Sequence, residues 1–345
     1  MKRGHRIFCI LCPHQNIMKN KQLPSKEICI RFVVDETEYA FWDANTRKVN
    51  LKFINQLDSD YFEYIAQLNL SLLNGEGNDK KTRQHAAINM RLAYSQGLEV
   101  LFSLIFATIQ AHDCVIGWFL KYSNRELFSI AKKFRDGKGI YTKLALPVRG
   151  WRDFANIVFV GIEEQKENFL SKIEQFAYLW SHFFEDFLDP NLDKEYNSIK
   201  HGLRVNMGGK HYLMGLPEFN GKPVENQQWR TISKSEFGTT FFISEKIEKT
   251  PNFVVHEHSR NWNPENYFHG LMLISTSIKN ILVLLNKVNG SEKDINYYFP
   301  NDENFSEKPW EIGNSSSITH NSSVDKKKIP LLTKKDILFV YETSD

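Results

Sequence analysis

Four polar side chains near the middle of the chain have the types and the spacing that could act on a phosphodiester. Steps of three, four and three residues separate them: Lys194, Asn197, His201 and Arg204. On a helix these steps place all four on one face. Cationic side chains and an amide can bind phosphate oxygens, and an imidazole can transfer a proton near neutral pH. The pattern therefore predicts a face that binds phosphate or an RNA backbone, with Lys200 as a further cation.

The helix that must position these residues has a second, apolar face. Steps of four, three and four residues connect its members, Leu192, Tyr196, Ile199 and Leu203. This face must bury against a neighbouring helix. Asp189-Pro190 predicts the start of the helix, because aspartate caps the end and proline suits the first position. We expect the helix to end between Gly202 and Gly208-Gly209, where its negative end would favour a charged His201.

The segment 195–204, with sequence EYNSIKHGLR, resembles the motif of the HEPN superfamily. Proteins of that superfamily are helical bundles, and many cleave RNA in toxin–antitoxin and anti-phage systems. Their motif is an arginine followed, after four to six residues, by a histidine. Here Lys194 stands six residues before His201, and Tyr196 stands where the RN-x-x-x-HG variants carry arginine. Both alignments therefore lack the arginine.

The resemblance implies a function, a set of roles and a partner. It implies an RNA-binding or metal-independent RNA-cleaving protein of prokaryotic defence or a toxin–antitoxin system, with no cofactor. The implied catalytic residues are His201, Asn197 and Lys194, and the implied substrate-binding residues are Lys200 and Arg204. A second subunit usually completes such a site, so RNA and a homodimer partner are expected.

The same polar residues are also what an ordinary solvated helix face carries. On this alternative the chain is a non-enzymatic interaction or scaffold protein that dimerises through the same fold. His201→Ala distinguishes the two, because only a nuclease would lose RNA cleavage. A second test is whether Asn197 and His201 line a cleft or are covered by the chain's own β-strands.

Other candidate metal ligands occur in pairs without the further ligands that a site needs. Cys9-x-x-Cys12 with His14 and Cys29 is half of a zinc site, and a structural zinc site takes four ligands at orderly spacing. A second set comprises His182-x-x-Glu185 and His256-x-His258. We predict no metal site from these residues. The chain also lacks the glycine-rich motifs of P-loop and Rossmann proteins, and the G-x-S-x-G motif of hydrolases.

One carboxylate lies in a strongly apolar stretch. Glu99 interrupts the run from Leu98 to Ile109, so it must be paired or protonated. We expect Arg91 or a lysine on another helix as its partner. The run falls short of the roughly 20 apolar residues that span a bilayer, so we predict a buried core helix and no membrane association.

The composition limits the class of protein. Hydrophobic residues make up 41% of the 345 residues, enough for a packed core and against global disorder. The formal net charge of +3 does not indicate a strong general nucleic-acid binder, although a local basic patch remains open. The four cysteines do not form the framework of a small secreted domain, so we expect a cytoplasmic protein.

Periodicity predicts a mainly α (α+β) fold: a helical bundle of four to five long helices with a small β insertion. The clearest apolar stripe lies in 163–188 and consists of Phe169, Ile173, Phe176, Trp180, Phe183 and Phe187. Further helices are expected at 58–73, 81–111, 125–134, 151–160 and 264–289.

The expected domain boundaries follow from these elements. Residues 1–25 form an irregular N-terminal extension and 26–54 a small extended or β segment. Residues 55–290 form the helical bundle domain, with the β insertion at about 210–262. Residues 291–345 form a polar linker and a C-terminal strand or tail, with 337–342 as the strand.

Overall fold

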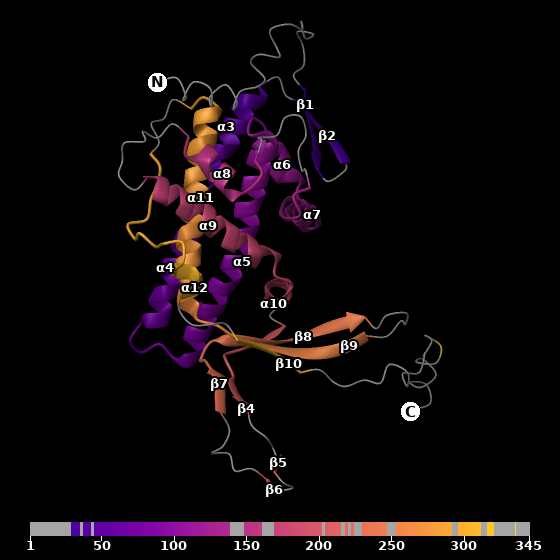
Figure 1. Ribbon diagram of the computed structural model, residues 1–345, viewed down its shortest axis with the longest axis vertical. Coiled ribbons are helices and arrows are strands. Elements are labelled where there is room, and N and C mark those ends of the chain that lie inside the picture. The colour runs from indigo at the N-terminus through magenta and orange to yellow at the C-terminus, as the bar shows by residue number, and fades with distance from the viewer. Residues whose placement is uncertain are drawn as a thin grey trace, which may run out of the picture.

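The computed structural model describes residues 29–34, 37–42, 45–138, 148–160, 169–201, 204–214, 218–219, 222–223, 230–246, 253–291, 296–311, 316–320 and 335. Helices dominate this part of the chain, and the strands form small antiparallel sheets. The mainly helical fold with a small β portion is therefore as the sequence predicts. The long helices stand beside one another in Figure 1, and strands β4 to β10 project from one end of this helical body.

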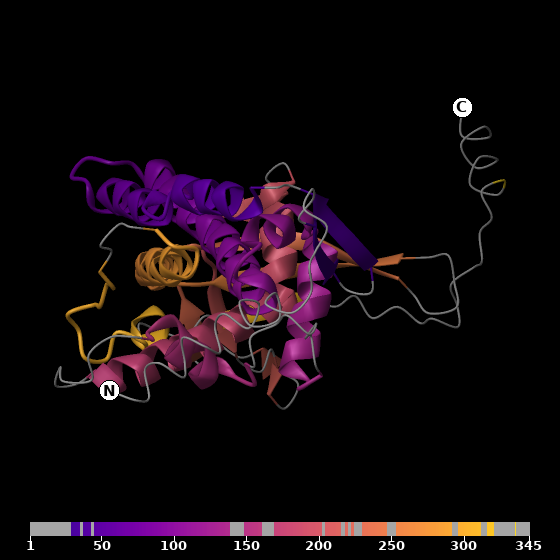
Figure 2. The ribbon, with the colours of Figure 1, turned by 90° about the horizontal axis from the view of Figure 1, so that it is seen from above.

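Three long helices pack directly on one another. They are α4 (Tyr61–Asn74), α5 (Lys80–Ala111) and α11 (Pro264–Val288), and each contacts the other two. Viewed from above, α11 lies alongside α4 and α5 (Figure 2). The predicted boundaries of these helices are close to the observed ones. Asp79 and Asn263 cap α5 and α11 by accepting hydrogen bonds from backbone N–H groups of the first turn.

The aromatic-rich helix α9 (Phe169–Leu188) packs against α5, α7 and α8. All six residues of its predicted stripe are buried: Phe169, Ile173, Phe176, Trp180, Phe183 and Phe187. Trp180 also donates a hydrogen bond to Ser277 of α11 at 2.9 Å. The stripe thus joins α9 to the same core as α11.

Shorter helices surround the long ones. They are α3 (Thr46–Gln56), α6 (Val115–Lys121), α7 (Asn124–Arg135), α8 (Trp151–Val158), α10 (Pro190–Lys200) and α12 (Lys308–Glu311). Helix α7 begins with a reciprocal capping box between Ser123 and Glu126. This cap fixes the orientation of a helix whose last turn carries Lys132, Lys133 and Arg135.

The largest sheet has four strands in the order β10-β9-β8-β3. Its strands are β3 (Val205–Met207), β8 (Gly238–Lys246), β9 (Phe253–Asn261) and β10 (Ser316–His320). Strands β4 (His211–Met214) and β7 (Arg230–Lys234) form a second antiparallel pair, and β5 (Glu218–Phe219) and β6 (Lys222–Pro223) a third. All but β3 and β10 lie within the predicted insertion at 210–262. Near α6, β1 (Cys29–Val34) pairs with β2 (Thr37–Trp42).

The extended structure predicted for 26–54 is correct only for its first part. Residues 46–56 form helix α3 rather than a strand. Val49, Leu51 and Phe53 alternate as in a strand, but the buried residues are Thr46, Asn50 and Ile54, at steps of four. Burial at helical spacing therefore decides the structure of this segment.

Part of the predicted polar linker at 291–328 packs on the helical core. Phe305 is 2% exposed and its ring lies 4.9 Å from that of Phe176. Trp310 contacts Phe183, and β10 adds to the edge of β9. A few aromatic side chains therefore anchor a segment whose average composition is polar. The strand predicted at 337–342 lies outside the described residues.

Two described helices, α5 and α11, have the length and hydropathy of a membrane span. Their most apolar 18-residue windows are 67% and 72% buried inside the protein. This burial is compatible with a soluble protein in which both helices form the core.

Candidate functional site

Helix α10 positions the polar residues singled out by the sequence. Asp189 caps it by accepting a hydrogen bond from the backbone N–H of Asn191 at 2.8 Å, and Pro190 is its first residue. Leu192, Tyr196 and Ile199 are all buried, as the predicted apolar face requires; Leu203 lies outside the described residues. The helix ends at Lys200, earlier than predicted, because the backbone of His201 leaves helical geometry.

The early end of the helix divides the predicted polar face. Lys194 and His201 are exposed, and Arg204 lies beyond the helix just before β3. Arg204 remains close to the helix end, since its Nε donates a hydrogen bond to the carbonyl of His201 at 3.0 Å. Lys194 lies on the side of α10 toward β9. The pKa of His258 on β9 is lowered, first by burial and then by the charge of Lys194. Arg204 therefore does not share a helix face with Lys194 and Asn197.

Asn197 lines an open groove between α10 and α7. The groove has a volume of about 500 Å³ and is lined by Asn124, Arg125, Phe128, Ser129, Lys132, Asp193 and Asn197. Asn197 donates a hydrogen bond to Asp193 at 3.0 Å, so its amide is held at this surface. Arg125 and Lys132 are exposed on α7. The groove thus presents the Asn197 amide and the Asp193 carboxylate from one helix and two cations from the other.

Lys200 belongs to the same side of α10 as the groove. Its ammonium group lies 5.0 Å from the centre of the Tyr196 ring. Its charge also opposes the rise that burial causes in the pKa of Asp193, a groove residue. Residues 193, 197 and 200 are separated by four and three positions, which is the spacing of one helix face.

Glu99 is held by partners other than the expected ones. It accepts hydrogen bonds from the Tyr196 hydroxyl at 3.0 Å and from the Asn124 amide at 2.9 Å. Burial raises the pKa of Glu99, and Lys200 opposes that rise without cancelling it. The expected partner, Arg91, lies on α5 but binds a different carboxylate. Tyr196, at the position where the related motif carries arginine, therefore connects α10 to α5.

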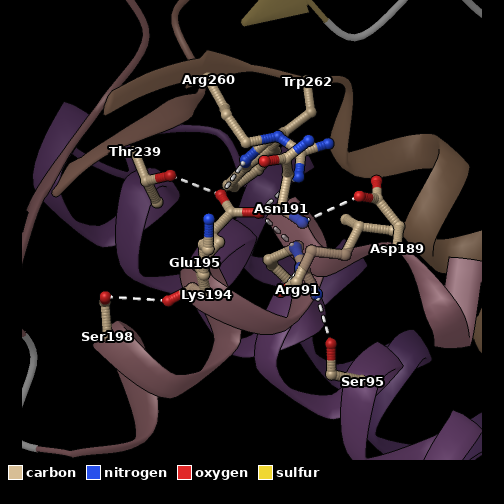
Figure 3. A network of polar contacts seen from close by, with 11 residues as sticks. Arg91, Ser95, Asp189, Asn191, Lys194, Glu195, Ser198, Thr239, Arg260 and Trp262 are labelled. Carbon is tan, nitrogen blue, oxygen red and sulfur yellow. Dashed lines mark hydrogen bonds and ion pairs between the residues drawn. The ribbon is translucent and has the colours of Figure 1, made fainter. Parts of the chain in front are cut away.

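Glu195 is the carboxylate that Arg91 binds, and both side chains are fully buried. Arg91 donates from Nε to Glu195 at 3.0 Å, from Nη1 to Ser95 at 2.6 Å and from Nη2 to the Leu192 carbonyl at 3.0 Å. Figure 3 shows Glu195 on α10 facing Arg91 on α5, with Arg260 and Trp262 reaching the same carboxylate from the end of β9. Helix α10 is therefore tied to α5 by charge as well as by apolar contact.

The β-sheet completes this buried network. The Trp262 indole donates to Glu195 at 2.9 Å, the Thr239 hydroxyl donates to the same oxygen, and Arg260 Nη1 lies 3.7 Å from the other oxygen. Burial alone would raise the pKa of Glu195, but Arg91, Arg260 and these hydrogen bonds outweigh it and lower the pKa. Glu195 is thus a charged connection between two helices and a sheet.

Sequence reasoning missed this network, although one signal was present. Glu195 lies three residues after Leu192 and four before Ile199, so its spacing places it on the apolar face of α10. A carboxylate on a buried face needs a cation. The identity of that cation depends on how α5 and β9 pack, which a helical wheel of α10 does not contain.

The other candidate ligand pairs have ordinary partners. His256 lies 3.3 Å from Glu245, His258 from β9 contacts Thr319 of β10, and His182 packs between Tyr178 and Trp310. Within the described ranges, no three His, Cys, Asp or Glu side chains group as a metal site would. Cys9, Cys12 and His14 lie outside those ranges. No protein-family model, no curated protein and no solved structure matches the chain.

Proposed function

We propose that the groove between α7 and α10 binds the phosphate backbone of RNA. The observation that carries this proposal is the open groove itself, with Arg125 and Lys132 on one wall and Asn197 on the other. Guanidinium, ammonium and amide groups are the usual donors to phosphate oxygens. Lys200 adds a third cation beside it. Phe128, on the same helix as the two cations, gives a ring on which a base can stack.

Binding rather than cleavage is the activity that the geometry supports best. His201 is exposed at the end of α10, but Arg204 approaches its carbonyl rather than its imidazole. A general acid or base acts through a nearby reacting group. The HEPN-like assignment and a role in defence belong to this same proposal and rest on the motif at 195–204. A bundle of four to five long helices and a cytoplasmic location belong to it as well, and they rest on the apolar periodicity and on the cysteine usage.

Fluorescence anisotropy with a labelled single-stranded RNA of about 15 nucleotides tests the groove. The double variant Arg125→Ala/Lys132→Ala should raise the Kd at least tenfold, or about 1.4 kcal/mol. The matched control Lys80→Ala/Lys81→Ala removes the same charge at the start of α5. These lysines lie about five helical turns before Glu99, the α5 residue that contacts Asn124 of the groove. Equal Kd values for the two variants would reject the groove. The same RNA, incubated with wild type and with His201→Ala, reports any cleavage that depends on the imidazole.

A homodimer is the second candidate, and the surface of α4 favours it. Four large apolar side chains are exposed at steps of three, four and four residues: Tyr61 (47%), Tyr64 (64%), Leu68 (45%) and Leu72 (36%). Such a stripe can pack on its own copy in an isologous, antiparallel contact. A stable interface buries about 1,200–2,000 Å² in total, so the stripe would form the centre of a wider contact.

Light scattering coupled to size-exclusion chromatography tests this second candidate. Wild type should have the mass of a dimer at micromolar concentration, and Tyr64→Glu/Leu68→Glu should have the mass of a monomer. Leu170→Glu is the matched control, since Leu170 is 73% exposed on α9. A monomeric wild type would exclude α4 as the interface. A dimer that Tyr64→Glu/Leu68→Glu leaves intact would exclude it as well.

A further inference from the structure

A second cavity lies near the start of α10, next to the buried Glu195 network. Its volume is about 220 Å³. Residues from five helices and from β9 and the turn after it line the cavity: Tyr94, Asp186, Asp189, Leu192, Arg260, Trp262, Asn263, Asn266, Tyr267, Pro309 and Trp310. It shares no lining residue with the α7–α10 groove. The two sites are therefore separate and can be tested separately.

Four aromatic rings line this cavity. Tyr94, Trp262, Tyr267 and Trp310 come from four different parts of the chain. The rings of Tyr94 and Tyr267 lie 5.2 Å apart, and those of Trp262 and Tyr267 lie 5.3 Å apart. Rings held against one another in this way keep their orientation. They favour a flat, unsaturated ligand over an aliphatic one, which would not use their faces.

Two carboxylates line the cavity, and Asp186 supplies its hydrogen-bond acceptor, because Asp189 already accepts the capping hydrogen bond of α10. Asp186 accepts from the Tyr94 hydroxyl at 2.6 Å and from the Trp310 indole at 3.1 Å, both at Oδ2. These bonds fix the carboxylate and leave Oδ1 for another donor. Burial raises the pKa of Asp186 despite both hydrogen bonds, so an N–H group of a ligand would find a poorly solvated acceptor there.

A guanidinium group supplies the positive charge. The Arg260 side chain is only 9% exposed, and its nearest carboxylate oxygen is 3.7 Å away, beyond hydrogen-bond distance. Its Nε and Nη1 have no hydrogen-bond partner in the described part of the protein. Glu195 already binds Arg91 closely, so two buried guanidinium groups share one carboxylate. An anion entering the cavity would complete the charge balance of Arg260.

We propose that this cavity binds a mononucleotide. The base lies between the aromatic walls with an N–H edge on Asp186, and the phosphate pairs with Arg260. The volume is below the roughly 300–1,000 Å³ of pockets that enclose a drug-sized ligand, so part of the nucleotide would lie outside the cavity. A free amino acid would offer both charges but would leave the four rings without a stacking partner.

Isothermal titration calorimetry with the 5′-monophosphates of adenosine, guanosine, cytidine and uridine tests this inference. At least one of the four should bind to wild type, and Trp310→Ala should weaken that binding tenfold or more. Trp310→Phe keeps a ring in place and should retain most of the affinity. Arg260→Met should reduce the affinity for the nucleotide to that for the matching nucleoside, because only the phosphate contact is lost.

Three outcomes would overturn the inference. They are the absence of binding by all four nucleotides at millimolar concentration, equal affinity of wild type and Trp310→Ala, and equal preference of wild type and Arg260→Met for nucleotide over nucleoside. Circular dichroism melting of each variant shows that it is folded. Should Arg260→Met fail to fold, Arg260→Lys and the two Trp310 variants decide the question. RNA binding in the anisotropy experiment is not required for any of these results.

Discussion

Glu195 determines how α10 is held, because among the described residues it is the carboxylate that reaches both Arg91 and Arg260. The carboxylate and Arg91 are fully buried, and the Arg260 side chain is 9% exposed. A buried ion pair often contributes little net stability compared with an apolar replacement, but removing one partner leaves the other charge unpaired. The role of Glu195 is therefore to neutralise two guanidinium groups that the fold has already buried.

Glu195→Ala should lower the free energy of unfolding by about 3–5 kcal/mol, since two buried cations lose their counter-ion. Urea denaturation followed by circular dichroism measures this change. Lys194→Ala, one residue earlier and exposed, should change it by less than about 0.5 kcal/mol. A Glu195→Ala variant as stable as Lys194→Ala would show that the network is not required for folding.

Glu99 should make stability depend on pH in the direction opposite to an ordinary surface carboxylate. Its pKa is raised in the folded protein above its usual 4.5, first by burial. The folded state therefore binds a proton more readily than the unfolded state, and this contribution is present at low pH and lost as pH rises through the folded pKa. Glu99→Gln can still accept from Asn124 and donate to Tyr196, without a charge.

The free energy of unfolding of Glu99→Gln, relative to wild type, should therefore increase as pH rises from 4 to 7. Denaturation curves measured across this range give the difference directly. Glu185→Gln on the exposed side of α9 serves as the control, because it carries the same chemical change at a solvated position. If the difference in free energy of unfolding between wild type and Glu99→Gln stays constant with pH, the pKa of Glu99 is not raised in the folded protein.

At the scale of elements, the close approach of α5 and α11 depends on a glycine. A Cβ atom at Gly270 of α11 would lie 2.5 Å from Cε2 of Tyr94 on α5. The Tyr94 ring cannot easily move, since its hydroxyl is bonded to Asp186 and its face meets Tyr267. Gly97, on the opposite helix, is less constrained, because its Cβ would lie 3.1 Å from the end of the Ile274 side chain.

Gly270→Ala should therefore destabilise the protein by about 1–3 kcal/mol through overpacking. Helix propensity acts in the other direction, since alanine is favoured over glycine by about 1 kcal/mol within a helix. The unfolding temperatures of Gly270→Ala and Gly97→Ala show how far overpacking outweighs helix propensity at each position. We expect Gly270→Ala to unfold at the lower temperature, and the reverse order would show that Tyr94 can relax away from α11.

The sequence predicts the long helices well because each has enough turns for its apolar pattern to be clear. The stripes of α9 and α11 are examples, and Asp189-Pro190 and Asn263-Pro264 mark two helix starts. Short elements are less predictable. In α3 the helical and the strand pattern coincide over seven residues, and only the packing of Asn50 and Ile54 distinguishes them.

The candidate site was predictable in part. The two faces of α10 follow from spacing, and the burial of Tyr196 and Ile199 agrees with it. The end of the helix does not follow, so Arg204 was placed on the wrong element. The groove depends on Arg125 and Lys132 of α7, and the cavity on Arg260 of β9. Contacts between elements distant in sequence are absent from the periodicity of any single element.

At the scale of the whole molecule, α10 separates two sites of different character. Its outer side meets α7 at an open, basic groove, and its inner side meets α5 and β9 at the buried network and the aromatic cavity. The formal net charge is only +3, so the protein as a whole attracts RNA weakly. Under the proposed function, affinity for RNA must therefore come from the few cations of the groove.

The salt dependence of RNA binding should accordingly be modest and local. Three groove cations, Arg125, Lys132 and Lys200, would each displace counter-ions from the backbone, at about 0.7 per phosphate on a single strand. The logarithm of the association constant should fall with the logarithm of salt concentration with a slope of about −2. Arg125→Ala/Lys132→Ala leaves one cation, so its slope should be about −0.7.

Anisotropy titrations of the single-stranded RNA between 50 and 300 mM potassium chloride measure both slopes. The control Lys80→Ala/Lys81→Ala removes two charges from the start of α5 and should keep the wild-type slope, because counter-ion release counts contacts rather than total charge. If this control lowers the slope as much as the groove variant does, RNA is held by the overall field of the protein. In that case the groove between α7 and α10 is not its binding site.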